Sequence, residues 1–326
     1  MELTLTLSFF KKGLGRSLAA LALLAAALAS ACGSDKAVAP AADGKLAVVT
    51  TIYPMTYFTQ RVGGDRIRLT SLVPAGVEGH DYEPKPSDLQ AIDRAKVVVY
   101  NHPAFETWMA DALKSVGAGK SVVQAADTPL PEGTPEAKAG AAGGEEDGSG
   151  GMDPHVWQDP LKAMGIVRRI AGGLIAADPA GTQVYNANAD AVVRDLTALH
   201  ERYSAGLKNC SLNTIVVSHE AFGHMAKLYG LRQIGLSGLA PEAESSPAQI
   251  AGIVMKMKEL GVKYILVEPV VSQKLAETVA AETDAVLLPL HPIESLTPGE
   301  VAAGDDYLEL MDRNLQSLKT ALACQD

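Results

Sequence analysis

The chain has 326 residues, of which 28 are basic and 38 acidic, and its formal net charge at neutral pH is −10. A negative protein repels phosphate backbones and anionic lipid headgroups, which argues against nucleic acid and anionic membranes as binding partners. The length is more than a single hydrophobic core usually serves, so two domains are expected.

The first residues have the pattern of an export signal. Basic residues precede an apolar run over 18–29, which is too short to cross a bilayer as a helix, since that takes about 20 residues. Small residues follow and indicate a signal peptide over 1–31. Cys32 comes next, as in a bacterial lipoprotein signal, although Ala29 stands where leucine is usual. We expect a lipid on Cys32 that anchors the protein to a membrane surface; cleavage that leaves a free Cys32 is the alternative.

A small, polar tether over 32–44 leads into short apolar runs that alternate with stretches of helical periodicity. Helices are expected between the runs, the first with Met55, Phe58 and Val62 on its buried face. This alternation predicts a parallel β-sheet covered by helices on both faces. The runs expected to form its strands are 46–51, 67–73, 96–101 and 121–124.

The second half of the chain repeats this layout. The strand, polar turn and amphipathic helix over 47–58 have a counterpart over 214–225, and the segment over 86–101 has one over 246–269. We therefore expect an α/β protein with two similar parallel-sheet lobes. The expected domain limits are 45–177 for the N-terminal lobe and 209–326 for the C-terminal lobe.

Between the lobes, apolar residues recur every three or four positions over 178–208, from Tyr185 to Leu207. One helix of this length would span about 45 Å and act as a rigid strut that joins the lobes. The segment over 131–151 differs, since Pro, Gly, Ala and Glu dominate it and no apolar periodicity remains. We expect a mobile acidic loop there.

Three histidines stand at widely separated strand or loop ends, each close to carboxylates. They are His80 in GVEGHDYEP, His155 in DPHVWQDP and His219 after the strand-like run TIVVS. Imidazole is the commonest metal ligand in proteins, and parallel sheets bind ligands beyond the carboxyl ends of their strands. We therefore expect these histidines to meet between the lobes, together with a fourth group, His291 or Glu294.

Neighbouring carboxylates are expected to hold the far nitrogen of each ring and so to fix its tautomer and direction. For His102, His200 and His224 an ordinary structural role is expected. The candidate partners are Asp81 and Glu83 for His80, Asp153 and Asp159 for His155, and Glu220 for His219.

From about Lys45 to its end, the chain resembles the zinc- and manganese-specific solute-binding receptors of bacterial ABC importers. The resemblance rests on TTIYP, GVEGHDYEPKPSDL, NHPAFETW, DPHVWQDP, SHEAFGHMAKLYGL, PEAESSPAQI and VEPVVSQKLAETVAAET. It implies two α/β lobes joined by a rigid helix, with a metal ion held between them by one histidine from each of three motifs and a carboxylate of the last loop. These ligands are here His80, His155, His219 and Glu294. His291 stands where many relatives have Asp or Asn and is the rival for the fourth place.

Three imidazoles and one carboxylate suit tetrahedral zinc, whereas manganese prefers more oxygen ligands, so zinc is the expected ion and manganese the alternative. The resemblance implies an exported, monomeric receptor, periplasmic or at the cell surface, that delivers the ion to an ABC permease and its ATPase. An enzyme is not expected, because a zinc hydrolase needs an open coordination position and the sequence lacks H-E-x-x-H. An adhesin is the remaining alternative, although no adhesive module stands out.

Cys210 and Cys324 remain as a pair if Cys32 carries the lipid. In an oxidising compartment an isolated pair of cysteines is most simply a disulfide. It would tie the C-terminal helix to the segment before the strand that precedes His219. Two buried thiols are the alternative.

Overall fold

The computed structural model divides into two compact units, and the helices and strands that the structure describes lie in the second, Lys45–Asp326. The predicted signal peptide over 1–31, Cys32 with its tether up to residue 43, and the predicted acidic loop over 131–151 lie outside the described residues. The structure describes residues 44–115, 117, 119–126, 152–241 and 245–325.

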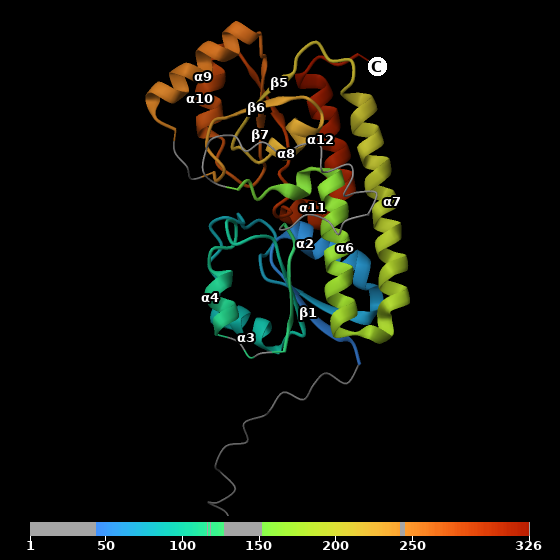
Figure 1. The fold of residues 1–326 in the computed structure, drawn as a ribbon. Helices are drawn as coiled ribbons and strands as arrows, with labels where there is room; N and C mark the ends of the chain where they lie inside the picture. Colours follow the sequence, from blue (N-terminus) through green and yellow to red (C-terminus); the bar gives the residue numbers. More distant parts are fainter. Residues whose placement is uncertain (1–43, 116, 118, 127–151, 242–244, 326) are drawn as a thin grey trace, which may run out of the picture. The chain divides into compact units, whose positions relative to one another are not determined.

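The first lobe is built on a sheet of four parallel strands in the order β2-β1-β3-β4 (Figure 1). The last three residues of β1 and all four of β3 are buried. Such continuous apolar runs are typical of parallel strands that are covered on both faces. The strands are β1 (Leu46–Thr50), β2 (Ile67–Ser71), β3 (Val97–Tyr100) and β4 (Ser121–Gln124). The helices are α2 (Tyr53–Gly63), η2 (Gly64–Arg66), α3 (Pro86–Arg94) and α4 (Met109–Lys114).

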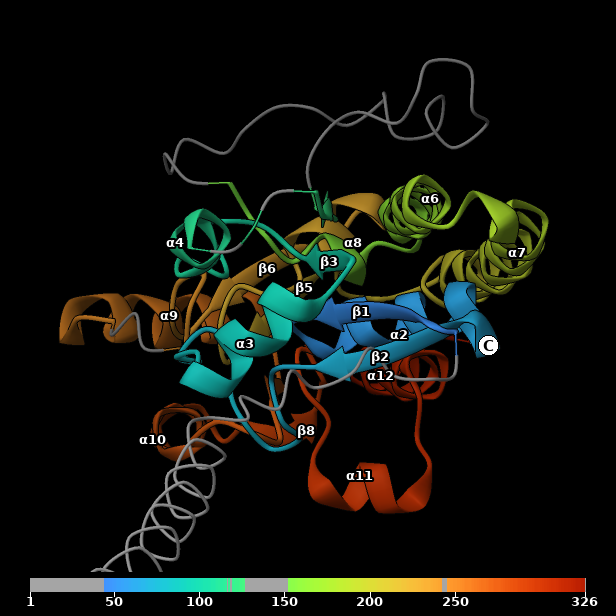
Figure 2. The same ribbon diagram turned by 90° about the horizontal axis from the view of Figure 1, so that it is seen from below.

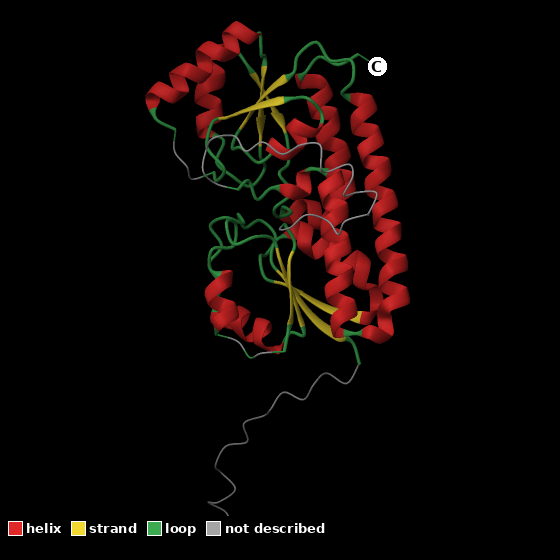
Figure 3. Cartoon of the chain, viewed as in Figure 1, coloured by secondary structure: helices red, strands yellow, loops and turns green. Residues whose placement is uncertain are grey.

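The second lobe repeats this strand order as β6-β5-β7-β8, again all parallel (Figure 3). The predicted fold class, two similar parallel-sheet α/β lobes, is therefore confirmed. Its strands are β5 (Thr214–Val217), β6 (Arg232–Gly235), β7 (Tyr264–Val267) and β8 (Val286–Pro289). Its helices are α8 (Gly223–Leu228), α9 (Pro247–Leu260), α10 (Lys274–Thr283), α11 (Pro298–Ala303) and α12 (Tyr307–Ala321).

Several predicted strands extend one or two residues too far at their carboxyl ends. The run over 46–51 ends as a strand at Thr50, and the run over 96–101 ends at Tyr100. The next residue of each run binds the buried carboxylate of Glu106 instead, through the Thr51 hydroxyl and the Asn101 backbone N–H. Because these residues serve the loops above the sheet, their apolar context does not mark them as strand.

A long helix, α7 (Thr182–Gly206), runs beside both lobes and corresponds to the predicted strut (Figure 1). It begins later than residue 178 because Pro179–Gly181 forms a short 3-10 turn, η4. The apolar stripe predicted for it is buried throughout, from Tyr185 to Leu207. It contacts α2 of the first lobe and α12 of the second.

Polar contacts bind the strut to both lobes. Toward the first lobe, the Asn188 amide donates to the Val62 carbonyl at 2.9 Å. Toward the second, the Tyr203 hydroxyl donates to the Met311 carbonyl in α12 at 2.6 Å. The strut is thus bound to both lobes.

A helix that the sequence analysis did not identify, α6 (Pro160–Ala177), packs along α7 and contacts β3 and β4 (Figure 2). Asp159 caps its first turn by accepting from the backbone N–H groups of Leu161 and Lys162. One hydrophobic cluster runs through the first sheet, α6, α7, β5 and α12. Because the buried apolar side chains are continuous between the lobes, the domain limits suggested by the sequence stay predictions.

Among the described residues, no helix has both the length and the apolar composition that crossing a membrane requires.

A disulfide joins Cys210 to Cys324 across 114 residues of sequence, which confirms the predicted pairing over two separate thiols. Cys210 follows α7 and Cys324 follows α12. On either side of the bridge, backbone hydrogen bonds join Leu212 to Leu322 at 3.1 Å and Gln325 to Asn209 at 3.0 Å. The disulfide therefore fastens the end of the strut to the C-terminal helix.

Replacing both cysteines, Cys210→Ser with Cys324→Ser, is expected to lower the free energy of unfolding by about 2–4 kcal/mol, because a cross-link over a long loop restricts the unfolded chain. Urea unfolding of the two proteins measures the difference. A reductant should bring the wild-type protein to the stability of the variant and leave the variant unchanged. Equal stability of the oxidised wild-type protein and the variant would contradict the expectation.

Candidate metal centre

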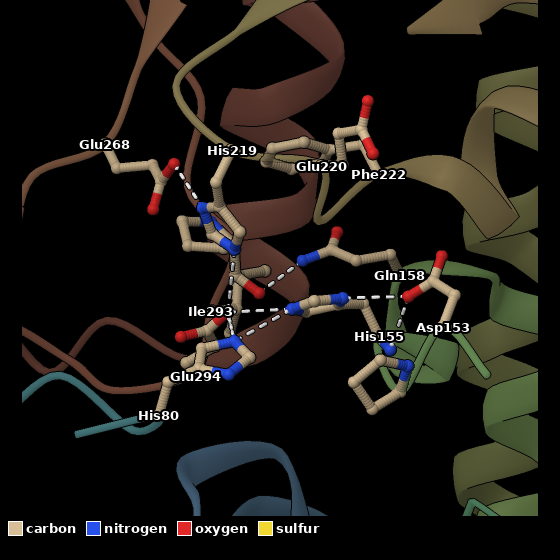
Figure 4. A network of polar contacts seen from close by, with 12 residues as sticks. His80, Asp153, His155, Gln158, His219, Glu220, Phe222, Glu268, Ile293 and Glu294 are labelled. Atoms are coloured by element: carbon tan, nitrogen blue, oxygen red, sulfur yellow. Dashed lines mark hydrogen bonds and ion pairs between the residues drawn. The ribbon is translucent and has the colours of Figure 1, made fainter. Parts of the chain in front are cut away.

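Four side chains from four separate loops meet between the lobes (Figure 4). His80 lies in the loop between β2 and α3, and His155 lies just before η3 (Val156–Gln158), which leads into α6. His219 follows the end of β5, and Glu294 lies in the loop after β8. The loops that follow the carboxyl ends of β2, β5 and β8 thus supply three of the four, as expected for parallel sheets.

The four candidate ligand atoms lie within 4.8 Å of one another. The Glu294 Oε1 atom is 3.6, 3.3 and 3.4 Å from the Nε2 atoms of His80, His155 and His219. The Nε2 atoms of His80 and His155 are 3.1 Å apart. The other described residues contain no second group of three or more potential metal ligands with this spacing.

The distances from Glu294 to the three histidines are close to the edge length of a zinc tetrahedron. Bonds of zinc to imidazole nitrogen and carboxylate oxygen are about 2.0–2.2 Å long, so neighbouring ligand atoms of a tetrahedral site lie about 3.3–3.5 Å apart. The three distances from Glu294 to the histidines, 3.3–3.6 Å, are close to that range. The side chains of His155 and His219 are fully buried, and Glu294 is 4% exposed.

Two atoms of this group, Nε2 of His219 and Oε1 of Glu294, are buried without a hydrogen-bond partner. A buried polar atom left unpaired in this way carries a desolvation cost of about 1–3 kcal/mol. Lone pairs on nitrogen that face a carboxylate oxygen repel it unless a proton or a cation lies between them. The geometry therefore fits a bound cation at the centre of the four atoms.

Carboxylates hold the far nitrogen of two of the rings. The Nδ1 atom of His155 is 2.8 Å from Asp153, and that of His219 is 2.6 Å from Glu268. Each carboxylate accepts the Nδ1 proton, so a neutral ring has its Nε2 lone pair directed at the centre. The predicted partner Asp153 is placed as expected.

The prediction that Glu220 orients His219 is wrong, because Glu268 takes that position (Figure 4). Glu268 directly follows β7, the strand next to β5, so the two side chains meet at the same sheet edge although 49 residues separate them. Glu220 follows His219 in the chain, but its side chain lies away from the ring in the figure. A signal for Glu268 was its place at the end of a buried strand.

Other predicted partners also have different positions. Asp159 caps α6 rather than holding His155. Asp81 and Glu83 are exposed. The His80 ring instead lies against Phe105, with ring centroids 4.0 Å apart. The direction of His80 is therefore set by packing on an aromatic face.

In the absence of a cation, the histidines and carboxylates of the site shift one another's pKa values. Burial alone would lower the pKa of His219, but the charges and hydrogen-bonding oxygens of Glu268 and Glu294 raise it to about 10. Burial would likewise raise the pKa of Glu294, yet the imidazoles of His155, His219 and His80 hold it well below its usual range. Glu294 is thus an ionised acceptor in a buried site.

Glu78 is a carboxylate that the sequence analysis missed. Its Oε2 atom accepts the backbone N–H of Asp81 at 2.9 Å, which shapes the turn that carries His80. Burial, together with the neighbouring Glu294, raises the pKa of Glu78 to about 8. A cavity of about 10 Å³, lined among others by Glu78, Glu268 and Glu294, has room for about one water molecule beside the site.

Comparison with known proteins identifies the family of the chain. The ZnuA family, described as zinc-uptake complex component A, periplasmic, matches residues 48–321. The chain belongs to this family. The chain is 37% identical over 317 residues to the high-affinity zinc uptake system protein ZnuA of Bacillus subtilis (strain 168), with 96% of this chain and 98% of that protein covered.

Two further ZnuA-family matches come from Streptococcus pneumoniae. The chain is 36% identical over 301 residues to the zinc-binding lipoprotein AdcA of the TIGR4 strain, but it spans only 59% of that protein's length and 92% of its own. The solved structure of the Zn(II)-bound ZnuA-like domain of AdcA is 34% identical, with a TM-score of 0.71 and coverage of 86% of this chain and 99% of that domain. The resemblance found in the sequence is thereby confirmed.

His291, the rival for the fourth place, lies outside the group in this member of the ZnuA family. Its Nδ1 atom accepts the backbone N–H of Ile293 at 2.8 Å, and its Nε2 atom is 3.3 Å from the Glu300 carboxylate. Both ring nitrogens are therefore engaged elsewhere. The remaining histidines also have local partners: His102 with Ala104, His200 with Tyr229, and His224 with Lys162.

The first turn of α8 supports Asp153 from the second lobe. The His224 ring nitrogen Nε2 donates to the Asp153 carbonyl at 2.9 Å, while Nδ1 accepts from Lys162 at 2.6 Å. The Asp153 carboxylate lies so close to Gly223 that a Cβ atom there would be 2.7 Å from Oδ2. The second lobe thus contributes a site histidine and the seat of the carboxylate that orients His155.

The variant Gly223→Ala is expected to displace Asp153 and to lower the free energy of unfolding by about 1–3 kcal/mol, because the added methyl group overpacks the seat. Urea unfolding of the variant and of the wild-type protein measures the difference in the free energy of unfolding. Gly252→Ala in α9 is the matched control, since nothing lies within 4 Å of a Cβ atom there. That control should gain about 0.5–1 kcal/mol from the loss of a helix glycine. The same gain in Gly223→Ala would show that Asp153 is not confined.

Proposed function

We propose that the protein is a receptor that captures one zinc ion between its lobes and delivers it to an ABC permease with its ATPase. His80, His155, His219 and Glu294 are the proposed ligands. The observation that carries the proposal is their spacing. The Glu294 oxygen lies 3.3–3.6 Å from the three imidazole nitrogens, about the edge length of a zinc tetrahedron, and all four atoms lie within 4.8 Å of one another.

The names of the relatives support zinc as the cargo. The Bacillus subtilis relative is named a high-affinity zinc uptake system protein, and the AdcA domain was solved with Zn(II) bound. The chain matches only 59% of the length of AdcA, so the comparison with AdcA supports zinc binding by the matched part alone.

The ligand set favours zinc over manganese, because manganese prefers more oxygen ligands than the single carboxylate supplied by Glu294. Imidazole also binds copper and nickel, so affinity alone does not select zinc. Four ligand atoms within 4.8 Å of one another suit an ion that accepts four ligands at tetrahedral angles. Metal analysis of natively purified protein reports which ion is carried.

The same geometry favours a receptor over an enzyme. A catalytic zinc keeps a position open for water, whereas four protein ligands here would fill a tetrahedral shell. We infer that the bound ion is cargo and that the protein is not a zinc hydrolase. An adhesive role stays the alternative, since the solved laminin-binding protein of Streptococcus agalactiae, 32% identical to this chain, is described as having both adhesin and metal-transporting activity.

We infer that the protein lies outside the inner membrane, in the periplasm or at the cell surface, as a monomer. A lipid on Cys32 would anchor it to the membrane surface. Because α7 is bound to both lobes, we infer that small movements of the loops around the site, rather than wide separation of the lobes, admit and release the ion.

Isothermal titration of the metal-free protein with zinc is expected to show tight binding at one site. Replacing His80, His155 and His219 together by alanine should abolish it, because three of the four ligands are lost. Absence of tight one-site binding by the wild-type protein, or its full retention by the triple variant, would remove the proposal.

Replacing only the carboxylate behind His219, Glu268→Gln, is expected to weaken zinc binding by about 10–100-fold, as is typical when a residue that orients a ligand is changed. Glu282→Gln, at an exposed position of α10, is the matched control and should bind like the wild-type protein. Titration calorimetry measures both. Equal affinity of the two variants would show that Glu268 does not support the site.

Zinc binding at pH 7.5 is expected to release protons. The pKa of His219 is raised to about 10, so the ring is protonated at pH 7.5 before zinc binds and must lose a proton to coordinate. About one proton or more should therefore be released for each zinc ion bound. The apparent binding enthalpies in two buffers should then differ by at least about the difference between the ionisation enthalpies of those buffers. Affinity should fall as the pH is lowered. Identical enthalpies in both buffers would contradict the assignment of His219.

A further inference from the structure

Ile293, the residue before Glu294, has a backbone conformation that is unusual for its type. Its φ angle is +63°, in the left-handed region. The other described non-glycine residues with positive φ are Asp284 and Ala323, so Ile293 is the β-branched one among them. A β-branched residue is a genuine outlier in this region, because its side chain crowds its own backbone. The surrounding structure must therefore hold the turn in place.

His291 supplies the most direct support. Its Nδ1 atom accepts the backbone N–H of Ile293 at 2.8 Å, within a fully buried turn. The ring must then be the tautomer with the proton on Nε2, which lies 3.3 Å from a Glu300 oxygen. Glu300 also caps α11 by accepting the Thr297 backbone N–H at 2.7 Å. The imidazole is thus fixed from the helix that follows the turn.

The residues on both sides of His291 and Ile293 are fixed as well. The backbone N–H and carbonyl of His291 bind the Asn314 side chain of α12, at 2.8 and 2.7 Å. The Pro292 carbonyl accepts from the Trp157 indole at 2.7 Å and from the Gln158 amide. Asn314, Trp157 and Gln158 thus hold the backbone of the two residues before Ile293. The hydrogen bond to Ile293 itself comes from the His291 ring.

The turn determines where the next side chain points. Beyond it, the Glu294 carbonyl accepts the Tyr53 backbone N–H at 2.9 Å. Between these fixed points, a change of φ at Ile293 from positive to negative would redirect Glu294. Its Oε1 atom now lies 3.3–3.6 Å from the three imidazoles.

We propose that His291 is a positioning residue that holds Ile293 in the left-handed conformation and thereby aims Glu294 at the three histidines. The inference rests on the proposed function insofar as Glu294 binds zinc. It differs from a ligand role for His291, since both ring nitrogens are committed to Ile293 and Glu300.

Two substitutions of His291 separate these roles. In His291→Asn, the side-chain oxygen can accept the N–H two residues on, as asparagine does in turns. In His291→Phe, the bulk of the ring is kept and the acceptor is lost. We expect His291→Phe to bind zinc about 10–100-fold more weakly and His291→Asn to lose less than about tenfold. X-ray absorption should count three histidines around zinc in the wild-type protein and in both variants.

The matched control is His102→Asn. His102 makes the same local contact, with Nδ1 accepting the N–H of Ala104 two residues on at 3.0 Å, but it does not belong to the group of candidate ligands. This control should bind zinc like the wild-type protein. Equal losses in His291→Asn and His291→Phe, or a lower histidine count in either, would overturn the proposal in favour of a ligand role.

A structure of zinc-free His291→Phe decides the inference even if the wild-type protein does not bind zinc. We expect a negative φ at Ile293 and a Glu294 carboxylate that has left the three imidazoles. If Ile293 stays left-handed and Glu294 stays in place, His291 does not position it, whatever the protein binds. Failure of zinc binding by the wild-type protein would instead remove only the proposed function.

Discussion

Three imidazole nitrogens directed at one buried carboxylate oxygen are the constraint on which the rest of the structure depends. Without a proton or a cation between them, the unpaired Nε2 of His219 and Oε1 of Glu294 are costly to bury. Four loops that meet at such a point would separate if each were free to relax. The scaffold must therefore hold them together before the ion arrives, and most of the fold can be understood from that requirement.

The scaffold meets the requirement through continuity rather than through two independent halves. One hydrophobic cluster passes from the first sheet through α6 and α7 to β5 and α12. The strut is bound at both ends, and the disulfide fastens its end to the C-terminal helix. A preformed site loses little conformational entropy on binding, which favours tight capture. On the proposed function, such a scaffold would leave release of the ion to the loops that carry the ligands.

Much of this arrangement could be predicted from the sequence, because apolar alternation and the three histidine motifs are local signals. The parts that could not be predicted depend on packing. The helix α6 contains three glycines, which weaken its helical signal. One of them, Gly173, lies where a Cβ atom would be 2.2 Å from Val123 of β4, so the glycine reflects close contact with the sheet. Glu268 was missed because strand order, not sequence distance, brings it to His219.

The choice between His291 and Glu294 shows most clearly where sequence reasoning ends. Both residue types bind metals, both lie in one short loop, and both are buried. What separates them is a single dihedral angle at Ile293, which no rule of residue preference would assign to a β-branched side chain. Because that angle is held by the His291 ring, the two candidates have different roles in one turn: one faces the histidines because the other faces away. In such a loop, the residue that binds the metal can be identified only from the three-dimensional backbone conformation.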